Sequence, residues 1–206
     1  LVLFPLTGIV DLSSTAASYG HKIIFLFIGG FILALAIEKW KLHKRIALYI
    51  IMIIGNDISK IILGFMLATA FLSMWISNTA TTVMMLPIGL SIITQLNDNP
   101  NTEKNENKLF GKALMLSIAF SASIGGVATL IGTPPNLIFA SFIQESYGVE
   151  ISFLKWMKFG LPISILLLFI AWLYLTKIAF KFSHKEFTLG KQELSIQLKN
   201  LGPIKL

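Results

Sequence analysis

The stretch from Ile61 to Leu96 constrains the fold of this chain more than any other. Its 36 positions contain no Asp, Glu, Lys, Arg or His, and most of them are apolar. A continuous helix of that length would reach about 54 Å, whereas the hydrocarbon core of a bilayer is about 30 Å thick. The stretch must therefore turn back, either as two full passes or as a hairpin that dips into a membrane and returns. Its midpoint lies between Asn78 and Thr79, so the polar triplet Ser77-Asn78-Thr79 forms the tip or the turn.

Length and charge favour a re-entrant hairpin over two full passes. Two passes require about 40 apolar residues and a turn, but only 36 residues are available. Their turn would also be the Ser-Asn-Thr triplet, which has no charge or proline to hold it in water. A single crossing is disfavoured, because the basic residues on its two sides, 39–45 and 104–112, would then lie in different compartments.

The composition indicates a membrane protein throughout. Hydrophobic residues make up 55% of the chain and charged residues 13%, whereas a soluble domain has about 25% charged residues. The net charge of +7 does not indicate a nucleic-acid partner, because the basic residues cluster between apolar runs, as they do in cytoplasmic loops. The absence of cysteine excludes a disulfide framework and a thiolate metal site. We expect a multi-pass, all-α protein surrounded by lipid.

The first part of the chain, residues 1–56, is predicted to hold scaffold-type transmembrane helices. One of them spans Ile23–Ile37. The nine-residue apolar run Ile46–Ile54 is too short to cross, and with its basic front it is typical of a helix at the membrane interface. His43 in that basic front is expected to be solvated or to face the lipid headgroups. Because Leu1 already lies in an apolar run, we expect the chain to be a fragment of a longer protein.

The remaining chain divides into a candidate binding part, residues 57–143, and a C-terminal part, residues 144–206. The C-terminal part holds a spanning helix at 159–176 and a basic cytoplasmic tail. The binding part has three segments: the hairpin 58–96, an exposed loop 97–112 and a second apolar run 113–143.

A Gly-Thr-Pro-Pro motif interrupts the second apolar run. Pro135 has no N–H group, and Pro134 disfavours helical geometry at Thr133. A helix that reaches Gly132 should therefore unwind and expose carbonyl groups, and a new helix can begin at the prolines. Broken helices that face each other at mid-depth are typical of secondary transporters, where helix N-termini meet an anionic substrate and free carbonyls hold a cation.

The polar residues at the two breaks are suited to a monovalent cation. Ser73 precedes Ser77 by four residues, so both hydroxyls are expected on one helical face. With the Asn78 side-chain carbonyl and the Gly132 backbone carbonyl they would form a cage of neutral oxygens, which sodium prefers. Neither break contains a carboxylate, which argues against Mg²⁺ or Ca²⁺. The alternative is that these side chains only join helices to one another.

Three motifs resemble the divalent anion/sodium symporters, a family of bacterial dicarboxylate transporters and mammalian citrate and sulfate carriers. The motifs are Ser73-Met74-Trp75-Ile76-Ser77-Asn78-Thr79-Ala80-Thr81, Ala122-Ser123-Ile124-Gly125-Gly126 and Gly132-Thr133-Pro134-Pro135-Asn136. The run Ile24–Phe31 is also similar to the family. Its members have two inverted repeats, each with a re-entrant hairpin and a broken helix, and work as homodimers by an elevator motion. One copy of each motif implies one repeat, the N-terminal half of an elevator-type transporter of the cell inner membrane.

The resemblance also implies roles for individual residues. Sodium would be held by Ser73, Ser77, Asn78 and the Gly132 carbonyl, and a substrate carboxylate would meet Ser77, Asn78, Thr79 and Thr133. The implied function is sodium-coupled transport of a divalent anion, a C4-dicarboxylate such as succinate. Sulfate or citrate as the substrate, and sodium-independent dicarboxylate exchange, remain open within the family.

A membrane scaffold or an integral-membrane enzyme is the alternative from another class. An enzyme requires a His, Asp, Glu or Lys near the middle of the membrane. Both charge-free segments lack one. We therefore expect a transporter rather than an enzyme.

Overall fold

The computed structural model of the chain describes residues 3–20, 22–54, 57–97, 104–182, 196 and 198–202. Within these ranges every regular element is helical, which confirms the predicted all-α class. Most of the predicted basic tail and residues 98–103 of the predicted loop lie outside the described residues. In chain order the elements are α1 (Leu3–Leu6), α2 (Leu12–Tyr19), α3 (Lys22–Lys39), α4 (Leu42–Ile54), α5 (Ile58–Ser73), α6 (Asn78–Asn97), α7 (Lys104–Val127), α8 (Pro134–Tyr147), α9 (Phe153–Leu173) and the π-helical turn η1 (Tyr174–Ala179).

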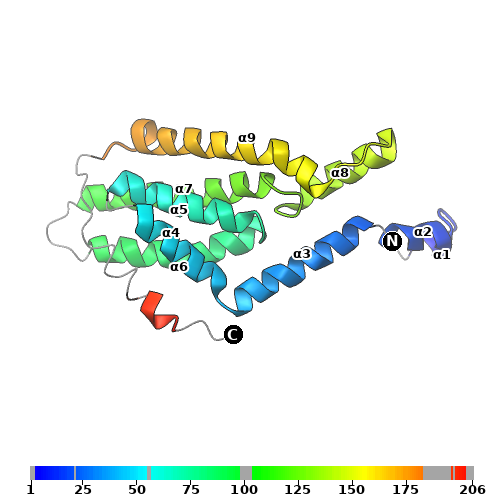
Figure 1. Ribbon diagram of the computed structural model, residues 1–206, viewed down its shortest axis with the longest axis horizontal. Coiled ribbons are helices and arrows are strands. Elements are labelled where there is room, and N and C mark those ends of the chain that lie inside the picture. Colours follow the sequence, from blue (N-terminus) through cyan, green and yellow to red (C-terminus); the bar gives the residue numbers. More distant parts are fainter. Residues whose placement is uncertain are drawn as a thin grey trace.

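Helix α7 forms the centre of the bundle. Helices α5 and α6 form an antiparallel pair joined by a short turn, and both pack against α7 (Figure 1). Helix α4 packs on α5, and α9 packs against α7 and α5. The core side chains come mainly from α5 and α7, and the most deeply buried of them are at most 1% exposed, for example Phe65, Met66, Phe110, Leu114 and Ile118. This packing places the C-terminal ends of α5 and α7 beside each other.

Local sequence signals set where helix α5 begins and where helix α8 begins and ends. The Asp57 carboxylate accepts a hydrogen bond from the Ser59 N–H (2.9 Å) and so caps the start of α5. Helix α8 begins at Pro134, where a missing N–H leaves no helical hydrogen bond unmade. It ends at Gly148, whose φ of 67° is the left-handed conformation that glycine adopts without strain.

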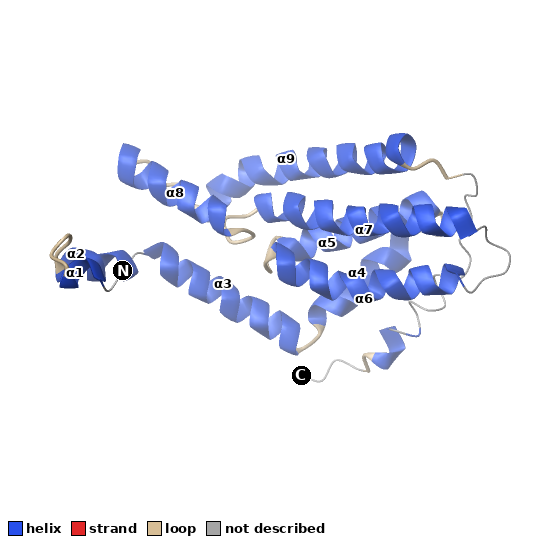
Figure 2. Cartoon of the chain, turned by 180° about the vertical axis from the view of Figure 1, so that it is seen from behind, coloured by secondary structure: helices blue, strands red, loops and turns tan. Residues whose placement is uncertain are grey.

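Helix α3 extends away from the bundle (Figure 2). It presents apolar side chains on its surface. Phe25, Phe31, Ile32 and Leu35 are each more than half exposed. An apolar surface of this size is covered by lipid or by protein in a stable molecule. The assignment of the helix at Ile23–Ile37 to a scaffold stays a prediction.

Two helical stretches are long and apolar enough to cross a membrane by length and composition. They are Asn105–Val127 and Phe153–Ala179, and the second contains the predicted span 159–176. The apolar parts of α5 and α6 are shorter, Ile58–Ser73 and Asn78–Thr94.

The predicted exposed loop 97–112 is wrong over its second half, because α7 begins at Lys104. Asn107 and Phe110 are buried, and with Leu114 they follow helical spacing along the face of α7 that meets the core. The charged residues between them obscure this pattern in the sequence.

The prediction that His43 is solvated is also wrong. The side chain is 3% exposed, and its Nδ1 lies 3.2 Å from the carbonyl oxygen of Ile37. Helix α4 begins at Leu42, four residues before the predicted start, and places His43, Ala47 and Ile51 on its buried face. Removal from water lowers the pKa of His43 below its usual value.

Candidate functional site

Two interhelical turns lie in contact at one end of the bundle. The α5–α6 turn comprises residues 74–77, and the α7–α8 turn comprises residues 128–133. The Thr129 hydroxyl in the second turn donates a hydrogen bond to the Met74 carbonyl in the first (2.6 Å). It also accepts one from the Gly132 N–H (3.0 Å). A single buried hydroxyl therefore ties the two turns together, and Figure 2 shows both loops at the same end of the helices.

Three oxygen atoms converge beside these turns. The Ser73 Oγ lies 2.6 Å from the Asn78 Oδ1 and 2.6 Å from the carbonyl oxygen of Ala122. Ser73 is fully buried. A hydroxyl has one hydrogen and can donate it to only one of these acceptors. Two arrangements satisfy all three oxygens. In the first, the Asn78 amide is rotated so that its Nδ2 donates to Ser73, and in the second, a cation is bound among the oxygens.

Glycines make this close approach possible. A Cβ at Gly126 would lie 2.3 Å from the Asn78 Oδ1. A Cβ at Gly132 would lie 2.5 Å from the carbonyl oxygen of Gly126 and 3.0 Å from that of Ser73. Gly132 therefore requires a residue without a side chain, because backbone atoms occupy the space, and a side chain at Gly126 would displace the Asn78 amide.

The Asn136 side chain at the start of α8 donates hydrogen bonds to carbonyl groups that the break exposes. Its Nδ2 donates to the carbonyl oxygens of Gly126 (2.9 Å) and Thr129 (2.7 Å), and the side chain is 7% exposed. Sequence reasoning quoted Asn136 within a motif but assigned it no role. It also missed Thr129 and the Ala122 carbonyl, because neither carries a local signal.

The structure brings some predicted site residues together and separates others. Ser73 and Asn78 are in contact, and Gly132 lies against the Ser73 backbone. The expectation that the hydroxyls of Ser73 and Ser77 share one helical face is wrong, because α5 ends at Ser73. Ser77 instead caps α6, where its exposed hydroxyl accepts from the Ala80 N–H (3.3 Å).

Thr79 and Thr133 lie at the starts of two helices. Thr79 is exposed in the first turn of α6. Thr133 is half-buried just before α8, with φ −147° and ψ 141°, the extended geometry predicted for a residue before proline. Because the turns that precede α6 and α8 are in contact, two helix N-termini with positive partial charge lie at the same end of the bundle.

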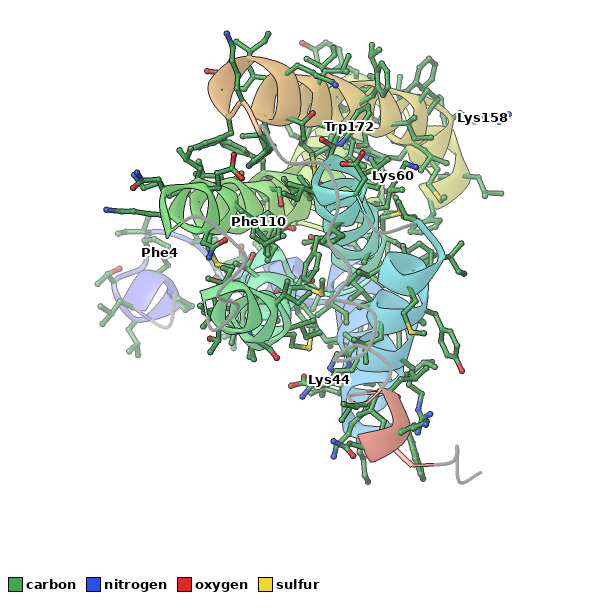
Figure 3. The ribbon with its side chains drawn as sticks, turned by 90° about the vertical axis from the view of Figure 1, so that its left-hand side faces the viewer. Phe4, Lys44, Lys60, Phe110, Lys158 and Trp172 are labelled. Carbon is green, nitrogen blue, oxygen red and sulfur yellow. The ribbon has the colours of Figure 1, made fainter. Side chains whose placement is uncertain are left out.

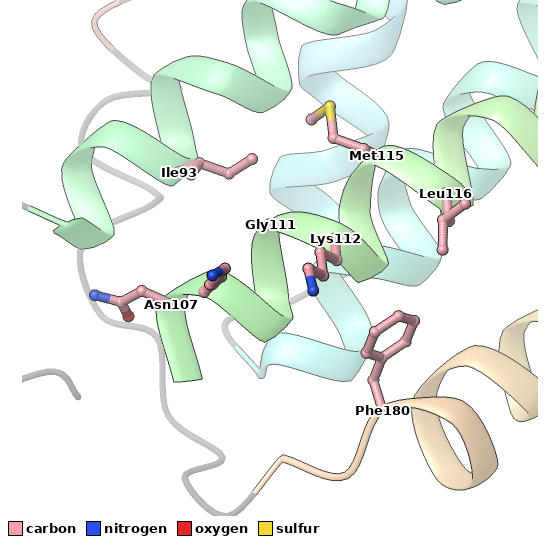
Figure 4. A pocket seen from close by; sticks show the side chains of 8 residues that line it. Ile93, Asn107, Gly111, Lys112, Met115, Leu116 and Phe180 are labelled. Atoms are coloured by element: carbon pink, nitrogen blue, oxygen red, sulfur yellow. The ribbon is translucent and has the colours of Figure 1, made fainter. Parts of the chain in front are cut away.

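A separate cavity of about 640 Å³ lies near the other end of α7, between α6, α7 and the chain after η1. Its lining is partly apolar, with Ile93, Met115, Leu116 and Phe180, and partly polar, with Asn107, Lys108 and Lys112 (Figure 4). It lacks the polar groups of the turns and does not coincide with them. The turns, rather than this cavity, are the candidate site.

The chain belongs to the citrate transporter family, whose sequence model matches residues 1–200. The sodium-dependent dicarboxylate transporter SdcS of Staphylococcus saprophyticus is 46% identical over 207 residues, which cover 100% of this chain and 40% of that protein. Proteins of the same name from Staphylococcus aureus strains USA300 and NCTC 8325 are 48% identical with the same coverage. The resemblance to the divalent anion/sodium symporters is confirmed, and the chain spans about 40% of the length of these curated relatives.

Proposed function

We propose that this chain is the first inverted repeat of a sodium-coupled transporter that carries a divalent anion, a C4-dicarboxylate such as succinate, across the cell inner membrane. The observation that carries the proposal is the contact of two helix breaks through the Thr129 hydroxyl and the Met74 carbonyl, beside the oxygens of Ser73, Asn78 and Ala122. The names of the relatives, sodium-dependent dicarboxylate transporters, support the choice of ion and substrate. A second repeat and a homodimer complete the proposed assembly.

The proposed hairpin does not span the membrane. Helix α5 has 16 residues, which reach about 24 Å and fall short of a hydrocarbon core of about 30 Å. Its turn would therefore lie inside the membrane, opposite the break between α7 and α8. Residues 57–143 would form the transport domain, and residues 1–56 part of the scaffold past which it moves as an elevator. Residues 144–206 would add the spanning helix 159–176 and a cytoplasmic tail.

Sodium would bind beside Ser73 and Asn78. When the Ser73 hydroxyl donates to the Ala122 carbonyl, the lone pairs of Ser73 Oγ and Asn78 Oδ1 face each other at 2.6 Å. A bound cation would remove that repulsion and stabilise the contact of Ser73 and Asn78 with α7. Ser77 and the Gly132 carbonyl would complete the set of ligands. Sodium would bind first, because its charge supplies the positive potential that a dianion needs.

The substrate carboxylate would meet the N-termini of α6 and α8. Ser77, Asn78, Thr79 and Thr133 stand at these two N-termini. Backbone N–H groups and hydroxyls at a helix start bind anions without a basic side chain. This arrangement would leave the second carboxylate of a dicarboxylate for the second repeat.

Uptake into proteoliposomes tests the proposed function with the full-length protein that contains this chain. Succinate uptake driven by a sodium gradient and absent with potassium is the expected result. Competition by unlabelled citrate or sulfate distinguishes the other substrates of the family. Citrate is tested in particular because the matching family is described as citrate transporters. Succinate uptake that is unchanged without sodium would instead indicate the sodium-independent exchanger.

Replacement of Thr129 by valine is expected to lower the free energy of unfolding by about 2–3 kcal/mol, because it leaves two buried backbone groups without partners. Those groups are the Met74 carbonyl and the Gly132 N–H. Thermal unfolding of the full-length protein in detergent measures the effect. Thr94→Val is the matched control, since its exposed hydroxyl donates to the Leu90 carbonyl in the same helix. Equal unfolding temperatures for the two variants would contradict the role of Thr129 in joining the turns.

A further inference from the structure

A basic pocket lies at the opposite end of α5 from the candidate site. Its volume is about 480 Å³, and it is formed by the start of α5 and by the end of α9 with η1. Lys60 from α5 and Lys177 from η1 line it, together with Lys181 just beyond η1. All three lysine side chains are exposed.

The wall of this pocket is held in place by hydrogen bonds. Trp172 donates from Nε1 to the Ser59 carbonyl (2.9 Å) and so joins α9 to the first turn of α5. Thr176, which is 4% exposed, donates to the Trp172 carbonyl (2.7 Å). Figure 3 shows Trp172 and Lys60 as neighbours between the two helices. The pocket therefore exists before any ligand binds.

The pocket carries positive charge that the described residues do not neutralise. Its lining contains three lysines and one carboxylate, Asp57. That carboxylate accepts from the Ser59 N–H (2.9 Å) as the cap of α5. Within the described part of the chain, none of the three lysines takes part in a salt bridge. The positive end of α5 adds to their potential.

The position of the pocket favours a ligand at a membrane surface. Thr176 and Lys177 lie in the last residues of the apolar stretch Phe153–Ala179, which is long enough to cross a membrane. Tryptophan and lysine at the end of such a stretch are typical of the interface between lipid and water. Basic pockets between helices at that level bind lipid headgroups.

We propose that this pocket binds the phosphate group of an anionic ligand at the membrane surface. The headgroup of an anionic phospholipid and a soluble phosphate share this chemistry. Lys60, Lys177 and Lys181 contact the phosphate, and Trp172 forms the wall beside it. The site is independent of sodium and of the turns at the other end of α5.

The first experiment measures lipid binding by the full-length protein that contains this chain. The protein is placed in nanodiscs of phosphatidylcholine with or without phosphatidylglycerol, and the retained lipid is quantified by native mass spectrometry. The variant K60Q/K177Q/K181Q is expected to bind phosphatidylglycerol at least about tenfold more weakly, since each lysine near an anionic surface contributes about 1 kcal/mol. The control K39Q/K155Q/K158Q removes the same charge from exposed lysines outside the pocket and is expected to bind as the unaltered protein does.

A second arm distinguishes the two sources of phosphate. Inorganic phosphate is titrated into nanodiscs that contain only phosphatidylcholine, and its binding is followed by the unfolding temperature. Retention of phosphatidylglycerol without a phosphate effect assigns the pocket to a lipid headgroup, and a phosphate effect that the K60Q/K177Q/K181Q variant loses assigns it to a soluble phosphate. The proposal is overturned if neither ligand binds, or if the pocket variant and the control lose binding equally. The single variant Lys177→Gln gives the same comparison if the triple variant does not fold.

Discussion

Replacement of Asn78 by alanine is expected to reduce sodium-dependent uptake by the full-length protein to near background. The substitution removes the Oδ1 that lies 2.6 Å from the Ser73 hydroxyl. A neutral group that contacts an ion contributes about 1.5–3 kcal/mol, so the expected loss is about 10- to 100-fold. Helix α6 should still form, because alanine is a strong helix former. Uptake of labelled succinate into proteoliposomes, with and without a sodium gradient, measures the effect.

Asn105→Ala is the matched control for this variant. Asn105 is an exposed residue in the first turn of α7, far along that helix from Gly126. Its replacement is expected to leave uptake unchanged. If the Asn78 variant retains full sodium-dependent uptake, Asn78 does not bind sodium and the proposed site is rejected.

Replacement of Gly126 by alanine is expected to stop transport while the protein remains folded. The new Cβ would lie 2.3 Å from the Asn78 Oδ1, closer than real Cβ atoms approach another heavy atom. The side chain of Asn78 can move, so the fold persists, but its contact with Ser73 is lost. Uptake and unfolding temperature are measured on the same preparation.

The neighbouring variant Gly125→Ala gives the contrasting result. There the new Cβ would lie 2.2 Å from the carbonyl oxygen of Ala70 and 2.6 Å from its Cα. Backbone atoms cannot move aside singly, so α5 and α7 must separate, at a cost of roughly 3 kcal/mol or more. Loss of folded protein is the expected outcome. Gly29→Ala, with no atom within 4 Å of its Cβ, is the control for both. Equal behaviour of the three variants would contradict this account of the packing.

The positions of the two breaks were predictable from the sequence, but the contacts between them were not. The charge-free length from Ile61 to Leu96 requires a turn near Asn78, and two prolines require a new helix at Pro134. Both are local effects of chain length and backbone chemistry. The Ala122 carbonyl meets Ser73 across 49 residues of sequence. Such a backbone partner depends on how α5 packs on α7, and every residue type carries the same carbonyl.

Errors in the sequence analysis arose where polar residues are buried. His43 and Asn107 lie among charged neighbours, which predicted that their side chains are exposed to water. Both side chains are buried in the bundle. Each stands on the buried face of its helix, where position along the helix outweighs the polarity of the surrounding sequence.

The error at Ser77 has a different cause. Ser77 was predicted on the same helical face as Ser73 by counting four residues along one helix, but that helix ends at Ser73.

The hydroxyl of Thr129 has a mechanical consequence. Because it bonds the α7–α8 turn to the Met74 carbonyl, and because Gly132 leaves no space between the two backbones, we expect the two turns to move together. A solute held at this junction would be carried by a rigid block made of α5, α6, α7 and the start of α8. Exposure to the two sides of a membrane would then require the whole block to shift, and cross-links within the block would leave that shift intact.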